Sequence, residues 1–339
     1  MEIKEALSEL IKGQDLQRED MSSVMLQILE GRSTDAQIGA FLVALSIKGE
    51  SIDEVISAVG VMRELSIKVE VDSKYLVDTC GTGGTGVSIF NVSTASAFVA
   101  SACGARVAKH GNRSATRSSG SADLLEQAGL SLELSPKDVS RCIEEVGMGF
   151  MFAAAHHSAM KYAIGPRKEI GLKTMFNILG PLTNPAGALN QVVGVYHKRW
   201  VRPIAEVLKE LGSIHVLVVH SKDHLDEISI ADETYVAELV NGSIKEYVIK
   251  PEDFGFNKQP LDDLIVSSPS ESLSLVKQGL LDKNYAASSM IAMNAGAALY
   301  AAGVTNSLRK GVLIATECVK SGKGVEKLEE LVSFSQSLS

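Results

Sequence analysis

Residues 78–94 constrain the fold of this chain more than any other stretch. An apolar run ending at Leu76 and Val77 has the composition of a buried strand, and glycines follow it at positions 81, 83, 84 and 86. Residues 91–94 then open an uncharged, alanine-rich run that is typical of a buried helix. Glycines let backbone N–H groups approach an anion, and the first turn of a helix offers further unpaired N–H groups. The sequence therefore predicts a strand, a glycine loop and a helix that together bind phosphate or pyrophosphate.

The spacing of these glycines excludes two common phosphate loops. The run has no GxxxxGK followed by Ser or Thr, so it is not a P-loop, and GTGGTG at 81–86 lacks the spacing of the dinucleotide-binding fingerprint. A tight strand-to-helix turn without any ligand stays open as an alternative for this stretch alone. The case for a ligand site therefore depends on residues farther along the chain.

The overall charge and composition limit the partners of such a site. The 339 residues carry a net charge of −8 at pH 7, which disfavours nonspecific binding to nucleic acid or to an anionic membrane. Residues 284–307 are uncharged, but their Ala, Ser, Gly, Asn and Met content favours a closely packed internal helix over a membrane span. The four cysteines form no Cys-x-x-Cys pair, and the N-terminus does not resemble a signal peptide. We therefore expect a cytoplasmic protein with reduced thiols and no nucleic-acid or membrane partner.

The periodicity of apolar residues divides the chain into a helical part and an α/β part. Three- and four-residue spacing predicts helices at 3–12, 19–31, 35–48 and 52–65, with capping boxes at Thr34 and Ser51. After residue 74, short apolar runs predict strands at 75–79, 105–109, 192–196 and 214–219, with 244–249 as a weaker candidate. Helical segments alternate with them, at 92–103, 121–128, 136–146, 200–211 and 284–302. Such alternation is typical of an α/β fold with a mostly parallel central sheet.

The predicted domains follow from this alternation. A small N-terminal helical domain covers residues 1–70, and a larger α/β domain covers 71–165 and 191–339. Residues 162–190 interrupt the pattern with glycines, prolines and polar residues, and we expect loops and short helices there. Of these, about 166–190 are predicted to return to the helical domain. The apolar faces of the first helices need a partner, which is either the rest of the chain or a second subunit.

A second loop rich in glycine and hydroxyl groups lies at residues 109–121. It follows the strand predicted at 105–109, contains Lys109 and Arg113, and leads into a helix. Ligands of open α/β sheets bind at the carboxyl ends of strands. A solvated loop is the alternative for this stretch alone. Two such loops after neighbouring strands favour one shared polyphosphate ligand.

Two further groups of polar residues complete the candidate site. His156, His157 and Arg167 lie close together in the sequence, and an arginine is a suitable partner for a carboxylate because its fork donates two parallel hydrogen bonds. Adjacent histidines rarely bind the same metal ion, so a metal site there is disfavoured. Asp226 and Glu227 follow the strand predicted at 214–219 and suit Mg²⁺, although an acidic pair on its own is usually a solvated surface feature.

In this order, these stretches resemble those of the anthranilate phosphoribosyltransferases, within the nucleoside-phosphorylase-like phosphoribosyltransferase family. The resemblance runs from Asp78 to about Glu238 and extends to the helical segments at both ends. Its most specific parts are NVST at 91–94, KHGNR at 109–113, SGSAD at 119–123 and TMFNILGPLTNP at 174–185.

The resemblance implies an α/β domain joined to a small helical domain, with the active site in the cleft between them and a homodimer formed through the helical domains. It also implies a pentosyltransferase of tryptophan biosynthesis. Such an enzyme transfers phosphoribose from 5-phosphoribosyl-1-pyrophosphate (PRPP) to the amine of anthranilate and releases pyrophosphate, with Mg²⁺ as cofactor. The chemistry needs no strong base, because the amine is already a neutral nucleophile, and we therefore assign no general acid or base.

The resemblance also implies a role for individual residues. PRPP is expected to contact Gly81, Gly84, Thr85, Asn91, Val92, Ser93, Thr94, Lys109, Gly111, Asn112, Arg113, Ser114 and Ser121. Anthranilate is expected to contact Gly81, Asn112, His157 and Arg167. Mg²⁺ is expected to bind Ser93, Asp226 and Glu227.

The chain departs from the family pattern at two places. Thr85 stands where the family usually has Asp, and Arg117 and Ser118 stand where many relatives have Ser and then Lys. Both changes leave the anion-binding loops in place, but the first is expected to alter metal dependence. Two other functions of the same fold remain as alternatives: a nucleoside phosphorylase, and a non-catalytic nucleic-acid-binding protein, which the net charge disfavours.

Overall fold

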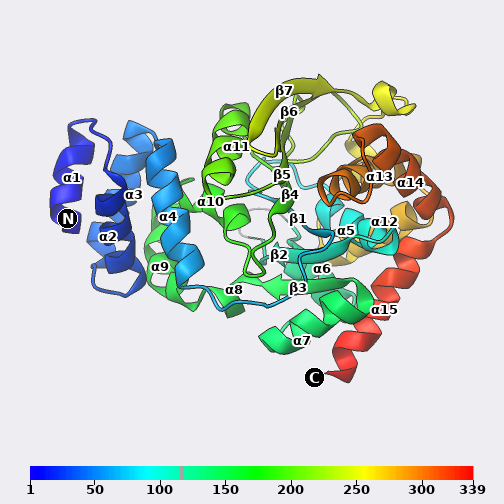
Figure 1. The fold of residues 1–339 in the computed structure, drawn as a ribbon, viewed down its shortest axis with the longest axis horizontal. Coiled ribbons are helices and arrows are strands. Elements are labelled where there is room, and N and C mark those ends of the chain that lie inside the picture. Colours follow the sequence, from blue (N-terminus) through cyan, green and yellow to red (C-terminus); the bar gives the residue numbers. More distant parts are fainter. Residues whose placement is uncertain (115–117, 339) are drawn as a thin grey trace.

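A computed structural model describes residues 1–114 and 118–338 and places a helical part beside a larger α/β part (Figure 1). The predicted fold class is confirmed: a small N-terminal helical domain and a larger α/β domain with a mostly parallel sheet. The strands within the described residues are β1 Leu76–Gly81, β2 Arg106–Gly111, β3 Met148–Phe152, β4 Asn190–Gly194, β5 His215–Ser221, β6 Thr234–Val240 and β7 Ser243–Ile249.

The helices divide into an N-terminal group and those that cover the sheet. The first group is α1 Ile3–Ile11, α2 Arg18–Leu29, α3 Asp35–Lys48 and α4 Ile52–Glu64. The next are α5 Val92–Ala102, α6 Ser121–Gln127, α7 Pro136–Arg141, α8 Ala153–His156, α9 Lys161–Ile170, α10 Phe176–Leu179 and α11 Val201–Glu210. The last four are α12 Pro269–Leu280, α13 Tyr285–Ala301, α14 Leu308–Lys320 and α15 Lys323–Ser337.

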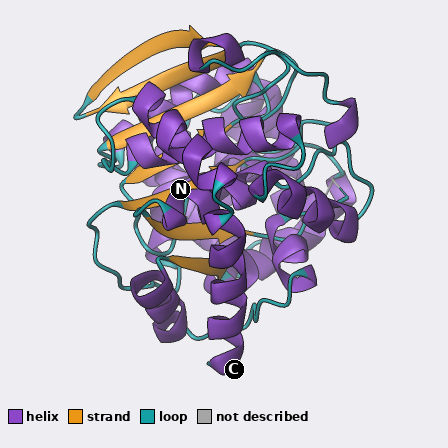
Figure 2. Cartoon of the chain, turned by 90° about the vertical axis from the view of Figure 1, so that its right-hand side faces the viewer, coloured by secondary structure: helices purple, strands orange, loops and turns teal. Residues whose placement is uncertain are grey.

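The strand order of the sheet is β3-β2-β1-β4-β5-β6-β7. Strands β3, β2, β1, β4 and β5 are parallel, whereas β6 and β7 are antiparallel at one edge, and Figure 2 shows the twist of the sheet. Successive strands run outward from β1 to β3, and the chain then returns to place β4 on the other side of β1. This reversal creates a crevice at the carboxyl ends of β1 and β4, where ligands of open α/β sheets bind.

The N-terminal helices begin where their sequences predict. The hydroxyl groups of Thr34 and Ser51 accept hydrogen bonds from the N–H groups of Gln37 and Glu54, which completes the two predicted capping boxes. The buried faces of α1–α4 form one apolar cluster with α11 and with one face of the sheet. This shared cluster fixes the helical part on the side of the sheet that is shown at left in Figure 1.

The stretch 162–190, predicted as loops and short helices, contains part of α9 and all of α10. Helix α9 packs on α2 and α3, and α10 contacts α4. The segment therefore lies against the N-terminal helices, although the exact domain limits near residues 70, 166 and 190 stay a prediction.

Helix α13 is the uncharged segment that resembles a membrane span in length. Nearly all of its residues are buried, and it packs against α5, α12 and α14. Within the described residues, no helix is both long and apolar enough to cross a bilayer. Small residues allow its close packing, since a Cβ on Gly296 would lie 2.4 Å from the backbone nitrogen of Val312 in α14. The prediction of a closely packed internal helix is confirmed.

Several elements were absent from the sequence prediction, namely strands β3 and β6 and helices α12, α14 and α15. Strand β6 joins β7 through Asn241 and Gly242, whose φ angles are +46° and +82°. An Asn-Gly pair with positive φ at both positions is the preferred two-residue hairpin turn. The Asn-Gly pair could therefore have revealed β6.

Replacing Gly296 with Ala should destabilise the protein by about 3 kcal/mol, because two helix backbones would have to separate to admit a methyl group. Urea denaturation measures this change. Gly60→Ala is a matched control: Gly60 is an exposed helical glycine, and a Cβ added to it would have no atom within 4 Å. In that control the free energy of unfolding should rise by about 0.5–1 kcal/mol. Equal effects of the two variants would contradict the close contact of α13 and α14.

Candidate active site

The glycine loop leaves β1 at Gly81 and reaches α5 at Val92. Gly83, Gly84 and Gly86 have φ angles of +65°, +74° and +81°, a backbone conformation that residues with a Cβ rarely adopt. The N–H of Gly83 donates a hydrogen bond of 2.8 Å to Oδ2 of Asp226. The loop predicted from the sequence is therefore present, and one of the two acidic residues holds its backbone.

Two glycines allow Asp226 to reach the ends of the strands. A Cβ on Gly81 would lie 2.5 Å from Oδ2 of Asp226, and one on Gly194 would lie 1.8 Å from its carbonyl oxygen. Gly81 and Gly194 are paired at the ends of β1 and β4. Because both positions lack side chains, the connection after β5 lies directly on the crevice.

The second loop begins at the end of β2 and touches the first. The hydroxyl of Ser119 donates a hydrogen bond of 2.8 Å to Oδ1 of Asn91, and Nδ2 of Asn91 donates one of 3.3 Å to the carbonyl oxygen of Ser119. Asp123 in α6 accepts hydrogen bonds from the N–H groups of Ser114 and Gly120. The two loops therefore form one continuous wall, as expected for a shared ligand. Arg117 lies outside the described residues.

Lys109 is buried at the junction of these loops, with 1% of its surface exposed. Its ammonium group donates hydrogen bonds to the carbonyl oxygen of Thr79 at 2.5 Å and to Oγ of Ser93 at 3.4 Å. The carboxylate of Asp78, also fully buried, accepts hydrogen bonds from the N–H of His110 at 3.2 Å and from Nδ2 of Asn184 at 2.8 Å. Burial lowers the pKa of Lys109 and raises the pKa of Asp78, and the attraction between their charges opposes both shifts.

Two histidines and an arginine also line the site. The rings of His110 and His157 lie with their centroids 5.1 Å apart, and Nε2 of each is buried without a hydrogen-bond partner in the described structure. The guanidinium carbon of Arg167 lies 5.1 Å from the ring centre of Phe176. Burial lowers the pKa of Arg167, and within the described ranges its guanidinium group has no carboxylate partner. These groups can receive a polar ligand that has an aromatic ring and a carboxylate.

Asp226, Glu227 and Ser93 lie together at the start of α5. Oε1 of Glu227 accepts a hydrogen bond of 3.3 Å from the N–H of Ser93. No cluster of three or more His, Cys, Asp or Glu side chains suited to a metal occurs in the described parts of the chain. Mg²⁺ does not require one, because it usually binds one or two carboxylates together with substrate phosphates and water. The donor set therefore fits Mg²⁺ in the presence of a phosphorylated ligand.

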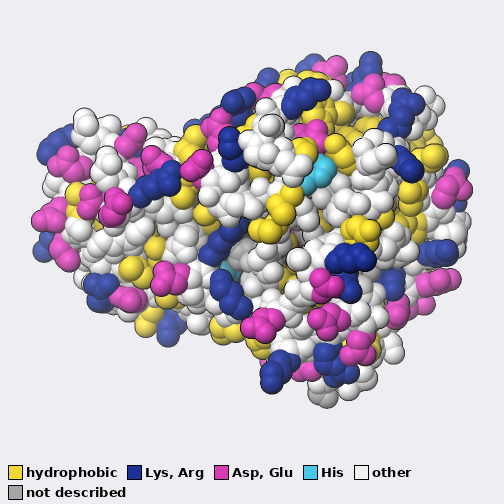
Figure 3. Space-filling view, viewed as in Figure 1, with side chains coloured by type: hydrophobic (Ala, Val, Ile, Leu, Met, Phe, Trp, Pro, Cys, Tyr) yellow, Lys and Arg dark blue, Asp and Glu magenta, His cyan; other side chains and the backbone are white. Residues whose placement is uncertain are grey.

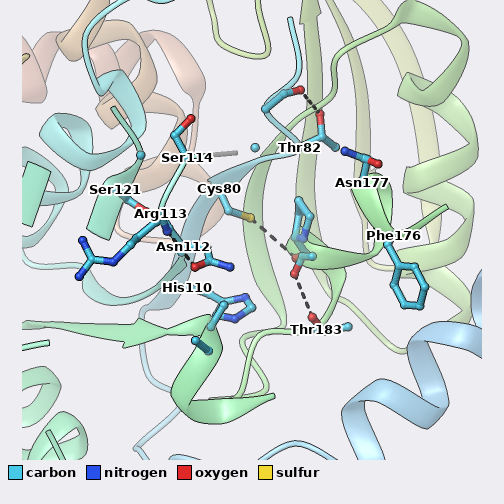
Figure 4. Close-up of a pocket in the computed structure, with 18 of the residues that line it drawn as sticks. Cys80, Thr82, His110, Asn112, Arg113, Ser114, Ser121, Phe176, Asn177 and Thr183 are labelled. Atoms are coloured by element: carbon cyan, nitrogen blue, oxygen red, sulfur yellow. Dashed lines mark hydrogen bonds between the residues drawn. The ribbon is translucent and has the colours of Figure 1, made fainter. Parts of the chain in front are cut away.

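The two loops, the histidines, Arg167 and the acidic pair line one cavity of about 430 Å³ (Figure 4). Most of the predicted site residues line it: Gly81, Gly84, Asn91, Ser93, Lys109, Gly111, Asn112, Arg113, Ser114, Ser121, His157, Arg167, Asp226 and Glu227. Thr85, Val92 and Thr94 are not among its lining residues. Val92 and Thr94 are buried in the interior, and the hydroxyl of Thr94 has no hydrogen-bond partner within the described residues. Arg113 directs its guanidinium group to Glu126, at 2.7 Å.

Several residues that line the cavity were not predicted. They include His110, Phe176, Asn177 and Thr183, which Figure 4 labels. His110 lies within the KHGNR motif, so the motif itself marked the position. The other three lie in the run 174–185, which was quoted for its resemblance but given no role in the site.

Comparisons with known proteins agree with this geometry. Residues 73–325 match the α/β domain of a glycosyl transferase family, and residues 4–66 match the helical bundle domain of a glycosyl transferase family. Anthranilate phosphoribosyltransferase of Marinomonas sp. (strain MWYL1) is 56% identical over 338 residues, which are 99% of this chain and 98% of that protein.

The chain belongs to the anthranilate phosphoribosyltransferase family.

Solved structures of anthranilate phosphoribosyltransferases have the same fold. The crystal structure of the enzyme from Thermus thermophilus is 40% identical, with a TM-score of 0.92 over 98% of this chain and 99% of that one. The enzyme from Saccharomyces cerevisiae in complex with PRPP and Mg is 25% identical, with a TM-score of 0.89 over 99% of this chain and 98% of that one. The family predicted from the sequence motifs is thereby confirmed.

The two buried histidines of this family member should remain uncharged in mildly acidic solution. Burial lowers the pKa of His110 to about 3 and of His157 to about 4, and their mutual repulsion contributes for His110. The unfolded chain takes up these protons near pH 6.5. The two rings therefore do not reduce the free energy of unfolding above about pH 6.5. As the pH falls from 6.5 toward 4, that free energy decreases by about 1.4 kcal/mol per pH unit for each ring.

Urea denaturation at pH 7, 6 and 5 measures this slope. His110→Gln should make the loss of stability between pH 6 and 5 smaller by about 1 kcal/mol than in the parent chain. An unchanged slope would mean that the pKa of His110 in the folded state is the same as in the unfolded chain.

Proposed function

We propose that this chain transfers the 5-phosphoribosyl group of PRPP to the amine of anthranilate and releases pyrophosphate, a step of tryptophan biosynthesis. The observation that carries the proposal is the joined pair of loops around Lys109, which lines one cavity together with Arg167. One side of this cavity has the donors for a doubly phosphorylated sugar, and the other has a partner for an aromatic acid. The yeast relative with PRPP and Mg in its structure supports the same choice of donor and metal.

The donor side would bind PRPP through backbone and charge. We assign the pyrophosphate to the glycine loop and the start of α5, including Asn91 and Ser93, and the phosphoribosyl group to the loop from Lys109 to Ser121. Asp226, Glu227 and Ser93 would hold Mg²⁺, which when bound neutralises charge on the pyrophosphate oxygens. Lys109 and the backbone N–H groups would stabilise the negative charge that develops on the leaving group as the bond to C1′ breaks.

The acceptor side would orient anthranilate without removing a proton from it beforehand. Arg167 has a geometry suited to the carboxylate, and Asn112, Gly81 and His157 lie around the same cavity. The amine is a neutral nucleophile, so no group has to act as a strong base. The depressed pKa values of His110 and His157 leave both rings neutral, and they act as hydrogen-bonding and packing groups. Alignment of the amine with C1′ then supplies much of the rate.

Positive charge gathers at the cavity although the whole chain is acidic. Its lining has four basic residues, Lys109, Arg113, Lys161 and Arg167, and two acidic ones, Asp226 and Glu227. The guanidinium group of Arg113 is paired with Glu126, which leaves three basic groups against the two carboxylates. Figure 3 shows Lys and Arg side chains beside the hollow between the helical part and the α/β part. This local field attracts two anionic substrates, and the net charge of −8 still argues against nucleic acid as a partner.

Product formation from PRPP and anthranilate, followed by fluorescence with and without Mg²⁺, tests the proposal. A nucleoside phosphorylase would instead consume a nucleoside and phosphate and form no phosphoribosyl-anthranilate. Phosphorolysis together with the absence of phosphoribosyl-anthranilate would overturn the assignment.

Arg167→Ala should raise the KM for anthranilate by about tenfold to a hundredfold and the KM for PRPP by less than about threefold. The expected effect corresponds to the loss of about 1.5–3 kcal/mol from charged hydrogen bonds to one substrate only. Lys168→Ala, an exposed neighbour on α9, is the matched control and should leave both constants unchanged. Equal increases for the two substrates would contradict this role of Arg167.

We also propose that the chain is a cytoplasmic homodimer formed through the helical part. Large apolar side chains are exposed there, with Ile11 at 77% and Ile47 at 82%. These residues belong to α1 and α3, which contact each other. An exposed apolar surface of this kind is typical of an interface between subunits.

Sedimentation equilibrium should give about twice the chain mass of 36.1 kDa. Ile47→Glu should shift the protein toward the monomer, because an interface would have to bury the new charge. Leu313→Glu changes another exposed apolar residue, on α14 at 64%, and should leave the dimer intact. A monomeric parent chain would rule the dimer out.

A further inference from the structure

Lys173 lies in the connection between α9 and α10 and was assigned no role above. Its ammonium group donates a hydrogen bond of 2.5 Å to the carbonyl oxygen of Gly84 in the glycine loop. The same nitrogen lies 4.4 Å from the ring centre of Tyr196, a cation–π contact. A Cβ on Gly84 would lie 3.2 Å from Cε of Lys173. The lysine stem therefore lies directly on the loop.

Tyr196 is itself fixed against the beginning of the glycine loop. Its N–H donates a hydrogen bond of 2.9 Å to Oγ1 of Thr82, and its hydroxyl accepts one of 3.1 Å from Nε1 of the buried Trp200. Lys173 thus touches the loop at Gly84 and touches the residue that holds the loop at Thr82. Together with the loop backbone from Thr82 to Gly84, these contacts form a closed ring.

The glycine loop has few side chains of its own with which to hold its shape. At residues 82–84 the loop is held by Asp226 at Gly83, by Tyr196 and the Gly194 carbonyl at Thr82, and by Lys173 at Gly84. The first two ties come from the carboxyl-end connections of the sheet. The third comes from the segment after α9, which packs on the helical part.

This segment also contributes residues to the acceptor side of the cavity. Arg167 lies in α9 before Lys173, and Phe176 and Asn177 follow it. The N–H of Thr174 donates a hydrogen bond of 2.9 Å to Oδ1 of Asn177, which fixes the backbone next to Lys173. The lysine therefore joins the segment that carries these acceptor-side residues to the glycine loop.

We propose that Lys173 is a positioning residue that holds the glycine loop against the acceptor side and so prepares it to bind PRPP. The inference rests on the proposed function, because it assigns PRPP to this loop. A loop that is already held in place loses less conformational freedom when a ligand binds, so its affinity is higher. Lys173 acts on the donor through the loop and is not assigned a contact with either substrate.

Lys173→Met removes the ammonium group and keeps most of the stem. Calorimetric titration with PRPP and Mg²⁺ should give a Kd about tenfold higher than in the parent chain. The KM for anthranilate should stay within about twofold, and the melting temperature should stay within about 2 °C because the side chain is exposed. Lys173→Arg, which can donate the same hydrogen bond and stack on Tyr196, should restore most of the affinity.

Lys168→Met is the matched control, since it removes an exposed lysine from the same segment. The inference is overturned if Lys173→Met binds PRPP as the control does, if its Kd falls, or if the arginine variant gives no recovery. The inference is also overturned if Lys173→Met weakens the binding of both PRPP and anthranilate and lowers the melting temperature. That result would indicate a general structural role. Failure of the parent chain to form phosphoribosyl-anthranilate would overturn the proposed function separately, because the titration needs no turnover.

Discussion

The ammonium group of Lys109 donates hydrogen bonds to the Thr79 carbonyl and the Ser93 hydroxyl, and so joins β2 to β1 and to the start of α5. A buried charge is costly unless other groups compensate it. Here the carboxylate of Asp78 provides opposite charge from the neighbouring strand and is held in turn by Asn184 and by the His110 N–H. Changes in either loop would disturb this arrangement. The donor half of the site therefore has one geometry that satisfies its buried charges.

The acidic residues that follow β5 reach the loops around Lys109 because the strand order of the sheet reverses at β1. The reversal opens a crevice at the carboxyl ends of β1 and β4, and glycines at the ends of both strands let Asp226 enter it. Asp226 then holds the glycine loop, while Glu227 holds the first turn of α5. The two acidic residues proposed for Mg²⁺ thus also hold the glycine loop and the start of α5.

Much of the fold and of the site could be predicted from the sequence. Local patterns were sufficient for the N-terminal helices, the buried helix α13 and the strand–loop–helix unit at 76–102, since each depends on residues close together in the chain. Strand β6 was missed although Asn241 and Gly242 mark its hairpin turn. Strand β3 is a five-residue edge strand without alternation, so periodicity could not distinguish it.

Contacts between distant segments explain the rest. No local pattern places Lys173 on Gly84, or His110 against His157, because each contact depends on how α8–α10 return to the sheet. Most of the predicted site residues do line the cavity, whereas Thr85, Val92 and Thr94 do not. In the NVST motif at 91–94, Asn91 and Ser93 line the cavity, and Val92 and Thr94 are buried in the interior. Their roles and those of the other predicted residues stay predictions until a ligand is observed.

A crystal structure of this chain with PRPP and Mg²⁺ tests the central claim most directly. The account predicts pyrophosphate within hydrogen-bonding distance of residues 81–94, the phosphoribosyl group against residues 109–121, and Lys109 at the junction between them. PRPP bound elsewhere on the chain, or bound with those two stretches far apart, would contradict it.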